Sequence, residues 1–335
     1  MRPFKYSKTE DASAAVKTVA ANADSQFLAG GTNIIDLMKE DVARPDELVD
    51  ITRVKFAQIK NLSDGANKGK LSIGALAKNT DTANHPLVRQ NYPLLSQAIL
   101  SGASGQIRNM ATNGGNLNQR TRCSYFYDTA MPCNKREPRT GCGALESINR
   151  MHAIFGWSND CIAVMPSDMC VALAALEAVV KVQKTDGTER SIPFAEYHRL
   201  PGNEPQKDNT LEHGELITAI ELPKNNFAAR SYYLKVRDRA SYAFALVSVA
   251  AALEMDGAKI KDVRVAMGGV AHKPWRALEA EKFLNGKEAT EANFKLAADA
   301  EMKSAKPLEH NKFKVELGKR AIVRALSMAM NGSKI

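Results

Sequence analysis

Two glycine pairs, each surrounded by short polar side chains, constrain this chain more than any other feature of its sequence. Gly30-Gly31 stands in FLAGGTNIID between a predicted strand and a predicted helix, and Gly114-Gly115 stands in IRNMATNGGNLNQ. Glycine permits positive φ and lets the backbone approach a ligand closely, and free N–H groups at a helix start attract anions. Together the loops predict a site that grips both ends of a dinucleotide, although an ordinary strand–turn–helix corner would also explain the first.

Neither loop has the spacing of the common nucleotide-binding motifs. Both G-x-G-x-x-G and G-x-x-x-x-G-K-[ST] are absent from them. The two glycine pairs are therefore interpreted as neither a Rossmann site nor a P-loop.

The predicted elements divide the 335 residues into three parts. Residues 1–53 are predicted to form an α/β unit whose first helix is capped by Thr9. Residues 54–223 contain a hairpin, short helices, the apolar helix SDMCVALAALEA, a second hairpin and the strand GELITAIELP. Residues 224–335 give strands first and helices afterwards, as in a separate α+β domain. A stretch without apolar periodicity, about 118–161, interrupts the middle part and predicts an exposed, irregular insertion.

That insertion holds most of the cysteines. Its segment RCSYFYDTAMPCNKREPRTGC contains three of the chain's five, and Cys161 lies at the end of the insertion. A chain of this length needs no disulfide staples, and the small odd number favours ligands over bridges. Cys170 lies among alanine, valine and leucine in the predicted apolar helix, where cysteine acts as a small buried hydrophobe.

A net charge of +9 raises the question of nucleic-acid binding. The basic residues are scattered and no aromatic-rich RNA motif accompanies them, so an anionic cofactor and a partner subunit explain the charge as well. The six histidines are dispersed and no Ser-His-Asp set is found, so no catalytic residue is assigned. The longest apolar run, YAFALVSVAAALEM, is too short and interrupted for a membrane span, and we expect no signal peptide.

The two glycine motifs, in this order, resemble those of the FAD-binding subunits of the xanthine dehydrogenase and carbon monoxide dehydrogenase type molybdenum hydroxylases. The resemblance covers nearly the whole chain, including SDMCVALAALEA, GELITAIELP and the closing α+β region. It is closest to the flavin subunits of bacterial periplasmic aldehyde oxidoreductases, with the flavin subunit of 4-hydroxybenzoyl-CoA reductase as the alternative.

The resemblance implies an α+β fold with a two-lobed FAD-binding domain of the vanillyl-alcohol oxidase type. Residues 1–53 would form the first lobe, residues 54–223 the second lobe, and residues 224–335 a C-terminal α+β domain of the CO dehydrogenase flavoprotein type. It also implies the residues that bind FAD, which are Ala29, Gly30, Gly31, Thr32, Asn33, Ile34, Arg108, Thr112, Gly115, Asn116, Asp168, Ile217 and Lys235.

These residues have different expected roles. The first glycine loop would hold the pyrophosphate, the second would form the opposite wall, and Arg108 would pair with an anion through its guanidinium fork. By resemblance, Asp168 contacts the flavin end of the cofactor, Ile217 packs on the isoalloxazine ring and Lys235 lies near that ring. The alternatives are that Asp168 is a plain helix cap, Ile217 a core residue and Lys235 a solvated strand residue.

A [4Fe–4S] cluster is predicted on Cys123, Cys133, Cys142 and Cys161, with Cys170 left out. The spacing, C-x9-C-x8-C-x18-C, is not that of zinc ribbons or bacterial ferredoxins, so disulfide and zinc interpretations stay open. Related subunits that carry a cluster also have a cysteine at the place of Cys161. Nearby cations would favour the thiolate forms, and the basic residues of this stretch are Arg120, Arg122, Lys135, Arg136 and Arg139.

The resemblance implies an electron-transfer subunit rather than a complete enzyme. Its partners would be a large molybdenum-cofactor subunit and a small [2Fe–2S] subunit, and electrons would leave FAD for an external acceptor. We expect export to the periplasm together with a partner that carries a signal, or alternatively a cytoplasmic location. The rival interpretations are a zinc-stabilised basic binding protein and a self-sufficient flavin oxidase.

Overall fold

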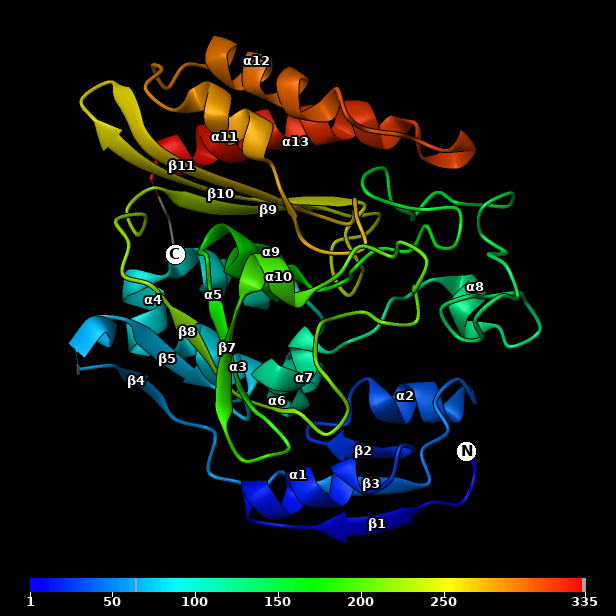
Figure 1. The fold of residues 1–335 in the computed structure, drawn as a ribbon. Coiled ribbons are helices and arrows are strands. Elements are labelled where there is room, and N and C mark those ends of the chain that lie inside the picture. Colours follow the sequence, from blue (N-terminus) through cyan, green and yellow to red (C-terminus); the bar gives the residue numbers. More distant parts are fainter. Residues whose placement is uncertain (64, 333–335) are drawn as a thin grey trace.

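The computed structural model describes residues 1–63 and 65–332, and three sheets lie one above another in the view of Figure 1. The lowest sheet belongs to the first lobe, the middle one to the second lobe and the uppermost to the C-terminal region. Within these residues, no helix is both long enough and apolar enough to cross a membrane.

The first lobe is a small parallel sheet in the order β1-β3-β2 with two helices. Its elements are β1 (Lys5–Lys8), α1 (Ala12–Ala20), β2 (Ser25–Leu28), α2 (Ile34–Lys39) and β3 (Glu47–Asp50). The central strand β3 is buried along its whole length, and Val16 and Val19 of α1 pack on this lobe's core. The predicted alternation of strands and helices is found.

The cap of α1 differs from the prediction. Asp11, not Thr9, precedes the first turn, and its carboxylate accepts hydrogen bonds from the backbone N–H groups of Ser13 and Ala14. Thr9 lies two residues earlier and its hydroxyl accepts a hydrogen bond from the N–H of Asp11. A capping side chain must reach the second or third N–H of the helix, and only Asp11 is placed for that.

The second lobe is an antiparallel sheet in the order β4-β5-β8-β6-β7. Its strands are β4 (Ile59–Asn61), β5 (Leu71–Gly74), β6 (Val179–Gln183), β7 (Glu189–Pro193) and β8 (Leu216–Leu222). Its helical elements are a 3-10 turn (Gly65–Asn67), α3 (Asn79–Asn84), α4 (Pro86–Asn91), α5 (Pro93–Ser101), α6 (Gly105–Met110), α7 (Asn113–Leu117), α9 (Asp168–Ala175) and α10 (Phe194–Tyr197). Both predicted hairpins are present, and the second glycine loop opens the short helix α7.

The C-terminal region is a sheet in the order β12-β11-β10-β9 between two helical layers. Its elements are β9 (Ser231–Val236), β10 (Val247–Asp256), β11 (Lys259–Gly268), β12 (Trp275–Arg276), α11 (Leu278–Leu284), α12 (Glu291–Met302), a 3-10 turn (Glu309–Asn311) and α13 (Phe313–Met330). Helices α11–α13 cover the outer face, while α5 and α9 of the second lobe contact the inner one. Because both faces are covered, residues 247–253 of β10 are all buried.

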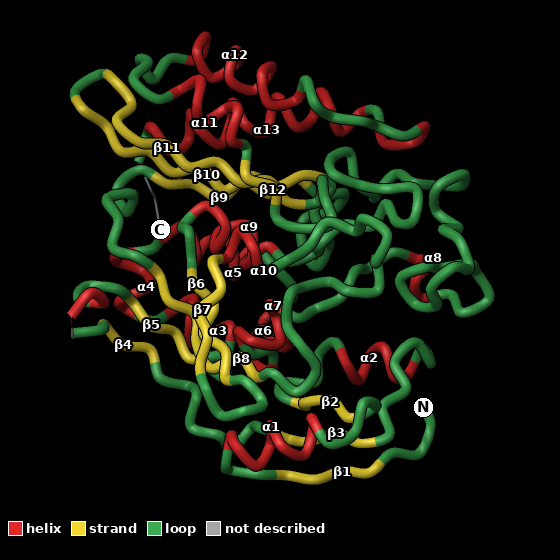
Figure 2. Tube along the Cα trace, in the orientation of Figure 1, coloured by secondary structure: helices red, strands yellow, loops and turns green. Residues whose placement is uncertain are grey.

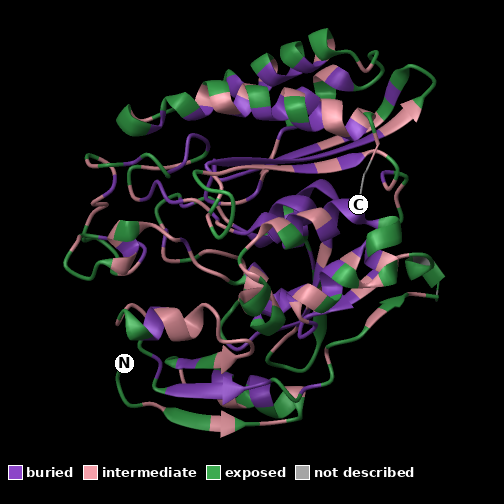
Figure 3. Cartoon of the chain, turned by 180° about the vertical axis from the view of Figure 1, so that it is seen from behind, coloured by how far each residue is buried: buried purple, intermediate pink, exposed green. Residues whose placement is uncertain are grey.

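The insertion between α7 and α9 is irregular, as predicted, apart from the short helix α8 (Ser124–Tyr127), and Figure 2 shows it almost entirely as loop. It is not the exposed loop that the sequence suggests. Figure 3 shows buried and half-buried stretches in this part of the molecule. Phe126, Cys133 and Phe155 of the insertion are buried. The insertion runs along the side of the molecule from α2 to α13. Phe126 packs with Leu37 of α2, and Lys314 of α13 donates to the carbonyl of His152.

Candidate cofactor sites

Both glycine loops line a single cleft of about 740 Å³ between the two lobes. Of the predicted FAD-binding residues, those that line this cleft are Ala29, Gly30, Gly31, Thr32, Asn33, Ile34, Thr112, Gly115 and Ile217. The volume is in the range of pockets that enclose a large cofactor. Segments far apart in the sequence thus meet at one concave surface.

The first glycine loop is shaped by a close backbone contact. A Cβ on Gly30 would lie 2.1 Å from the carbonyl oxygen of Met110, the residue that ends α6. Gly31 has a φ of +73°, a backbone conformation that residues with a Cβ rarely adopt. The backbone conformation therefore requires glycine at both positions. An ordinary strand–turn–helix connection would not impose so strong a constraint.

Asn33 connects the cleft to the insertion. Its Oδ1 accepts a hydrogen bond of 2.9 Å from the backbone N–H of Arg120, while its buried Nδ2 has no partner among the described residues. A buried amide donor without an acceptor is costly, and a bound ligand with oxygen acceptors would satisfy it. The residues present at this loop therefore fit a phosphate-bearing cofactor.

The second glycine loop is held from beneath. Thr112 caps α7, and its hydroxyl accepts a hydrogen bond of 3.2 Å from the N–H of Gly115. The buried side chain of Asn113 donates to the hydroxyl of Thr82 at 2.8 Å. These contacts fix the loop against α3, so its cleft-facing backbone is preorganised.

Three other predicted residues gather away from the cleft, around the turn that follows α5. Lys235 donates to Asp168 at 2.7 Å and to the carbonyl of Ser101 at 3.2 Å. Arg108 donates to the carbonyl of Gly102 at 2.5 Å. Burial raises the pKa of Asp168 above its usual value, while the Lys235 ammonium and the Tyr233 hydroxyl act in the opposite direction.

The alternative roles weighed for these residues are corrected in two cases. Lys235 is not a solvated strand residue, because its side chain is 4% exposed. Asp168 is not the helix cap, because the hydroxyl of Ser167 accepts the hydrogen bond from the N–H of Cys170. Ile217 is a core residue, as the alternative expects, and it also lines the cleft.

Asn116 lies between the two groups. Its Oδ1 accepts a hydrogen bond of 2.5 Å from the hydroxyl of Ser167, the residue before Asp168, and its Nδ2 donates to Asn79 at 2.7 Å. The end of the second glycine loop is thereby joined to the start of α9. The cleft residues and the Asp168–Lys235 pair are consequently parts of one connected framework.

Four of the five cysteines line one small hollow in the insertion, here called the cysteine pocket: Cys123, Cys133, Cys142 and Cys161. Cys170 is fully buried in the core of the second lobe and does not line it. All five thiols are free. In the described part of the chain, no group of three or more His, Cys, Asp or Glu side chains is arranged to hold a single metal ion.

Backbone pairing within the insertion brings these cysteines together. Cys133 and Cys142 face each other across an antiparallel bridge, flanked by a hydrogen bond of 2.7 Å from the N–H of Asn134 to the carbonyl of Gly141. Cys161 pairs with Ser158 in a tight turn. Cys123 precedes α8. An insertion without apolar periodicity is thus ordered by its own short-range hydrogen bonds.

Burial outweighs the predicted effect of the cations at the cysteine pocket: Lys135 favours the thiolate of Cys161, but burial opposes it more strongly. Lys135 and Arg120 are both paired with Asp208, at 2.5 and 2.8 Å, and hold the pKa of that partly buried carboxyl well below its usual range although desolvation opposes this. Burial raises the pKa of Cys123 to about 12 and of Cys161 to about 11. Lys135 and Arg120 are therefore partly neutralised by Asp208, and the thiols of Cys123 and Cys161 stay protonated unless a cation binds them.

His152 is a residue that the sequence interpretation missed. It lines the cysteine pocket, and its Nε2 lies 3.1 Å from the Sγ of Cys123. His152 and Cys123 also line a largely apolar cavity of about 230 Å³ that extends to Asp168 and Phe244. The signal for it in the sequence is its position between Cys142 and Cys161.

Comparison with known protein families gives two matches that together span nearly the whole chain. Residues 2–225 match the FAD binding domain in molybdopterin dehydrogenase, and residues 232–329 match the CO dehydrogenase flavoprotein C-terminal domain. The first match includes both glycine loops and the insertion.

Individual relatives agree with these families. The chain is 46% identical to the aldehyde oxidoreductase FAD-binding subunit PaoB of Escherichia coli, covering 98% of this chain and 99% of that protein. It is 29% identical to the glyceraldehyde dehydrogenase medium chain of Sulfolobus acidocaldarius, covering 85% and 82%. The carbon monoxide dehydrogenase structure from Hydrogenophaga pseudoflava has the same fold, with a TM-score of 0.76 at 24% identity over 99% of both chains. The chain therefore belongs to the FAD-binding medium subunits of the molybdenum hydroxylase family, oxidoreductase subunits of the aldehyde oxidoreductase and xanthine dehydrogenase type.

Proposed function

We propose that this chain is the FAD and [4Fe–4S] electron-transfer subunit of a molybdenum-dependent aldehyde oxidoreductase, in which electrons pass from iron–sulfur centres through FAD to an external acceptor. The substrate class is supported by the 46% identity to the PaoB subunit. Bound FAD supplies the redox chemistry, and the residues of this chain bind and orient it.

The FAD site we propose extends from the cleft to the Asp168–Lys235 pair. The residues of the first glycine loop and the free Nδ2 of Asn33 would meet the pyrophosphate, with Thr112 and Gly115 on the opposite wall. Ile217 would pack against the ring, and Arg108, Asn116, Asp168 and Lys235 would support the flavin end. The boundaries near residues 53 and 223, where the chain passes from one sheet to the next, are proposed as the limits of the lobes.

The single observation that carries the cluster is the convergence of four free cysteines, spread over residues 123–161, on one pocket. In a four-iron cluster each cysteine binds a different iron, so the ligands stand farther apart than the ligands of one ion. This is compatible with the lack of a single-ion site among the described residues, whereas a structural zinc requires four donors around one ion. The support for the cluster is that all four cysteines line this one pocket.

Iron content and the visible spectrum test this proposal. The purified chain should contain about four irons in addition to flavin, and a broad absorbance should underlie the two flavin bands. Cys161→Ala should lose or degrade the cluster, because a cysteine of the pocket is removed. Cys170→Ala is the matched control and should keep the iron, because Cys170 lies in the core of the second lobe. Iron lost from Cys170→Ala but kept in Cys161→Ala would show that the ligand set is wrong, and an iron-free wild-type chain would refute the cluster.

We further propose that the chain works with a large molybdenum-cofactor subunit and a small [2Fe–2S] subunit, and that it reaches the periplasm attached to a partner that carries an export signal. The purified single chain should not oxidise aldehydes with an artificial acceptor, and adding both partners should restore turnover. Turnover by the single chain would refute this division of labour. Detection of the chain in the periplasm when it is expressed alone would refute the export route.

A further inference from the structure

His152 is held at the cysteine pocket by contacts from several directions. It is 5% exposed, and its backbone carbonyl accepts hydrogen bonds from the Nζ of Lys314 at 2.9 Å and from the Nδ2 of Asn311 at 3.3 Å. Its backbone N–H donates to the carbonyl of Asn149 at 3.0 Å. The placement of the imidazole beside Cys123 is therefore fixed by α13 and the preceding 3-10 turn.

We propose that His152 donates a hydrogen bond from Nε2 to the sulfur of Cys123 and thereby raises the reduction potential of the cluster that the cysteines hold. This inference rests on the proposed function, since it needs the [4Fe–4S] group. His152 acts through Cys123 and is a positioning residue, not a ligand.

The chemistry of the two facing atoms gives the direction of the hydrogen bond. A cysteine that binds iron is a thiolate and can only accept, so the proton belongs on Nε2, 3.1 Å from Sγ. The other ring nitrogen, Nδ1, has no partner among the described residues. With the proton on Nε2, Nδ1 is an unpaired acceptor, which costs less free energy than the buried, unpaired N–H that the other tautomer would leave.

The expected effect follows from the charge of the cluster. Reduction adds negative charge, which spreads to the ligand sulfurs, and an N–H directed at one of them stabilises the reduced form. Cys123 and His152 line both the cysteine pocket and the apolar cavity that reaches Asp168. Cys123 is therefore on the side of the cysteine pocket that faces the proposed flavin end. The difference in reduction potential between the cluster and FAD governs electron transfer on that side.

Three buried histidines make a matched experiment possible. His198 and His272 are as buried as His152, and burial lowers the pKa of each to about 4, but their ring nitrogens bond the carbonyls of Leu117 and Arg199. Neither lines the cysteine pocket. His152→Leu removes the donor and His152→Gln keeps an amide that can donate, while His198→Leu and His272→Leu reproduce the loss of a buried imidazole elsewhere.

The measurements are iron content, potentiometric titration of the cluster followed by EPR, and the exchangeable-proton coupling of the reduced cluster in D₂O, all on the assembled complex. His152→Leu should keep its iron, shift the potential downward and lose one proton coupling. His152→Gln should lie between this variant and the wild type, and both controls should match the wild type. A wild-type potential in His152→Leu, or loss of iron from both His152 variants, would overturn the inference. An iron-free wild-type complex would instead overturn the proposed function on which it rests.

Discussion

Lys235 and Asp168 form an ion pair, with Nζ 2.7 Å from Oδ2, in which both side chains are more than nine-tenths buried. Lys235 belongs to β9 of the C-terminal sheet and Asp168 to the first turn of α9 in the second lobe. The pair therefore joins two parts of the molecule at the place where we propose the flavin end of FAD. Tyr233 adds a third member, since its hydroxyl donates to Asp168 at 2.7 Å.

Breaking this pair should separate its structural role from its role in binding. Asp168→Asn leaves the Lys235 ammonium buried without its counter-charge, so it should lower the free energy of unfolding by about 3–5 kcal/mol, measured in denaturant. Adding Lys235→Met should recover much of that loss. FAD affinity should remain reduced in the double variant if both side chains support the cofactor. Full recovery of both quantities would show that the pair is structural only.

The second glycine loop gives a direct test of the FAD cleft. Gly115→Val should abolish FAD binding, because its Cβ would lie 3.0 Å from the Thr112 hydroxyl and the side chain would occupy a wall of the cleft. Gly31→Val should also lose FAD, but its φ of +73° adds backbone strain, so Gly115 is the cleaner position.

The control for this test is Gly257→Ala in the turn between β10 and β11. Gly257 also has positive φ, so the variant should be destabilised, yet it lies outside the cleft. Flavin content after gel filtration measures the outcome. Full occupancy in Gly115→Val would contradict the assignment of this loop.

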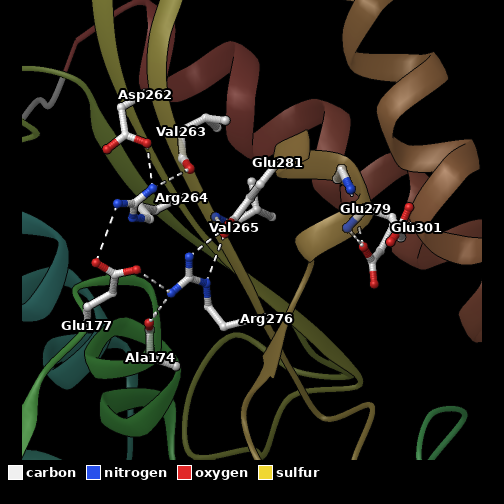
Figure 4. Close-up of polar contacts among 11 residues, drawn as sticks. Ala174, Glu177, Asp262, Val263, Arg264, Val265, Arg276, Glu279, Glu281 and Glu301 are labelled. Carbon is white, nitrogen blue, oxygen red and sulfur yellow. Dashed lines mark hydrogen bonds and ion pairs between the residues drawn. The ribbon is translucent and has the colours of Figure 1, made fainter. Parts of the chain in front are cut away.

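A second polar network joins α9 to the C-terminal sheet (Figure 4). Arg276 donates to Glu281 at 2.7 Å and to the carbonyl of Ala174 at 3.1 Å, and lies 3.4 Å from Glu177. Arg276→Met should cost about 3–5 kcal/mol of unfolding free energy, because Glu281 is left buried without its cation. Arg320→Met breaks an exposed pair with Glu316 and should cost about 0–1 kcal/mol. Equal losses in the two variants would mean that burial does not control the strength of these pairs.

Acid sensitivity should depend on the buried histidines, and His198 is the clearest case. Burial lowers its pKa to about 4 in the folded chain, against about 6.5 when unfolded. Between these values the unfolded chain binds a proton that the folded chain does not, so stability falls as the pH drops through this window. His198→Gln should reduce the stability lost between pH 7 and pH 4.5 by about 2 kcal/mol.

The matched control is His310→Gln, at an exposed histidine in the 3-10 turn before α13. Denaturant unfolding at several pH values measures both variants against the wild type. An unchanged pH profile in His198→Gln would show that this imidazole is already protonated in the folded chain.

The sequence by itself determined most of the helices and strands and the two glycine loops of the proposed FAD site. Helix α13 (Phe313–Met330) lies in the region where helices are predicted to follow the strands, because its apolar period is local information. The glycine pairs were recognisable because a backbone that needs positive φ or close approach restricts the residue type at that position.

Only the tertiary structure decided which distant side chains meet. Three contacts join segments that no periodic pattern in the sequence relates to each other. They are the contact between His152 and Cys123, the hydrogen bond from Arg120 to Asn33, and the ion pair of Lys235 with Asp168. The insertion is ordered by short hydrogen bonds and by contacts with α2 and α13, and neither leaves an apolar pattern in the sequence. Convergence of this kind depends on how three sheets and one insertion pack, and packing is a property of the whole chain rather than of any local stretch.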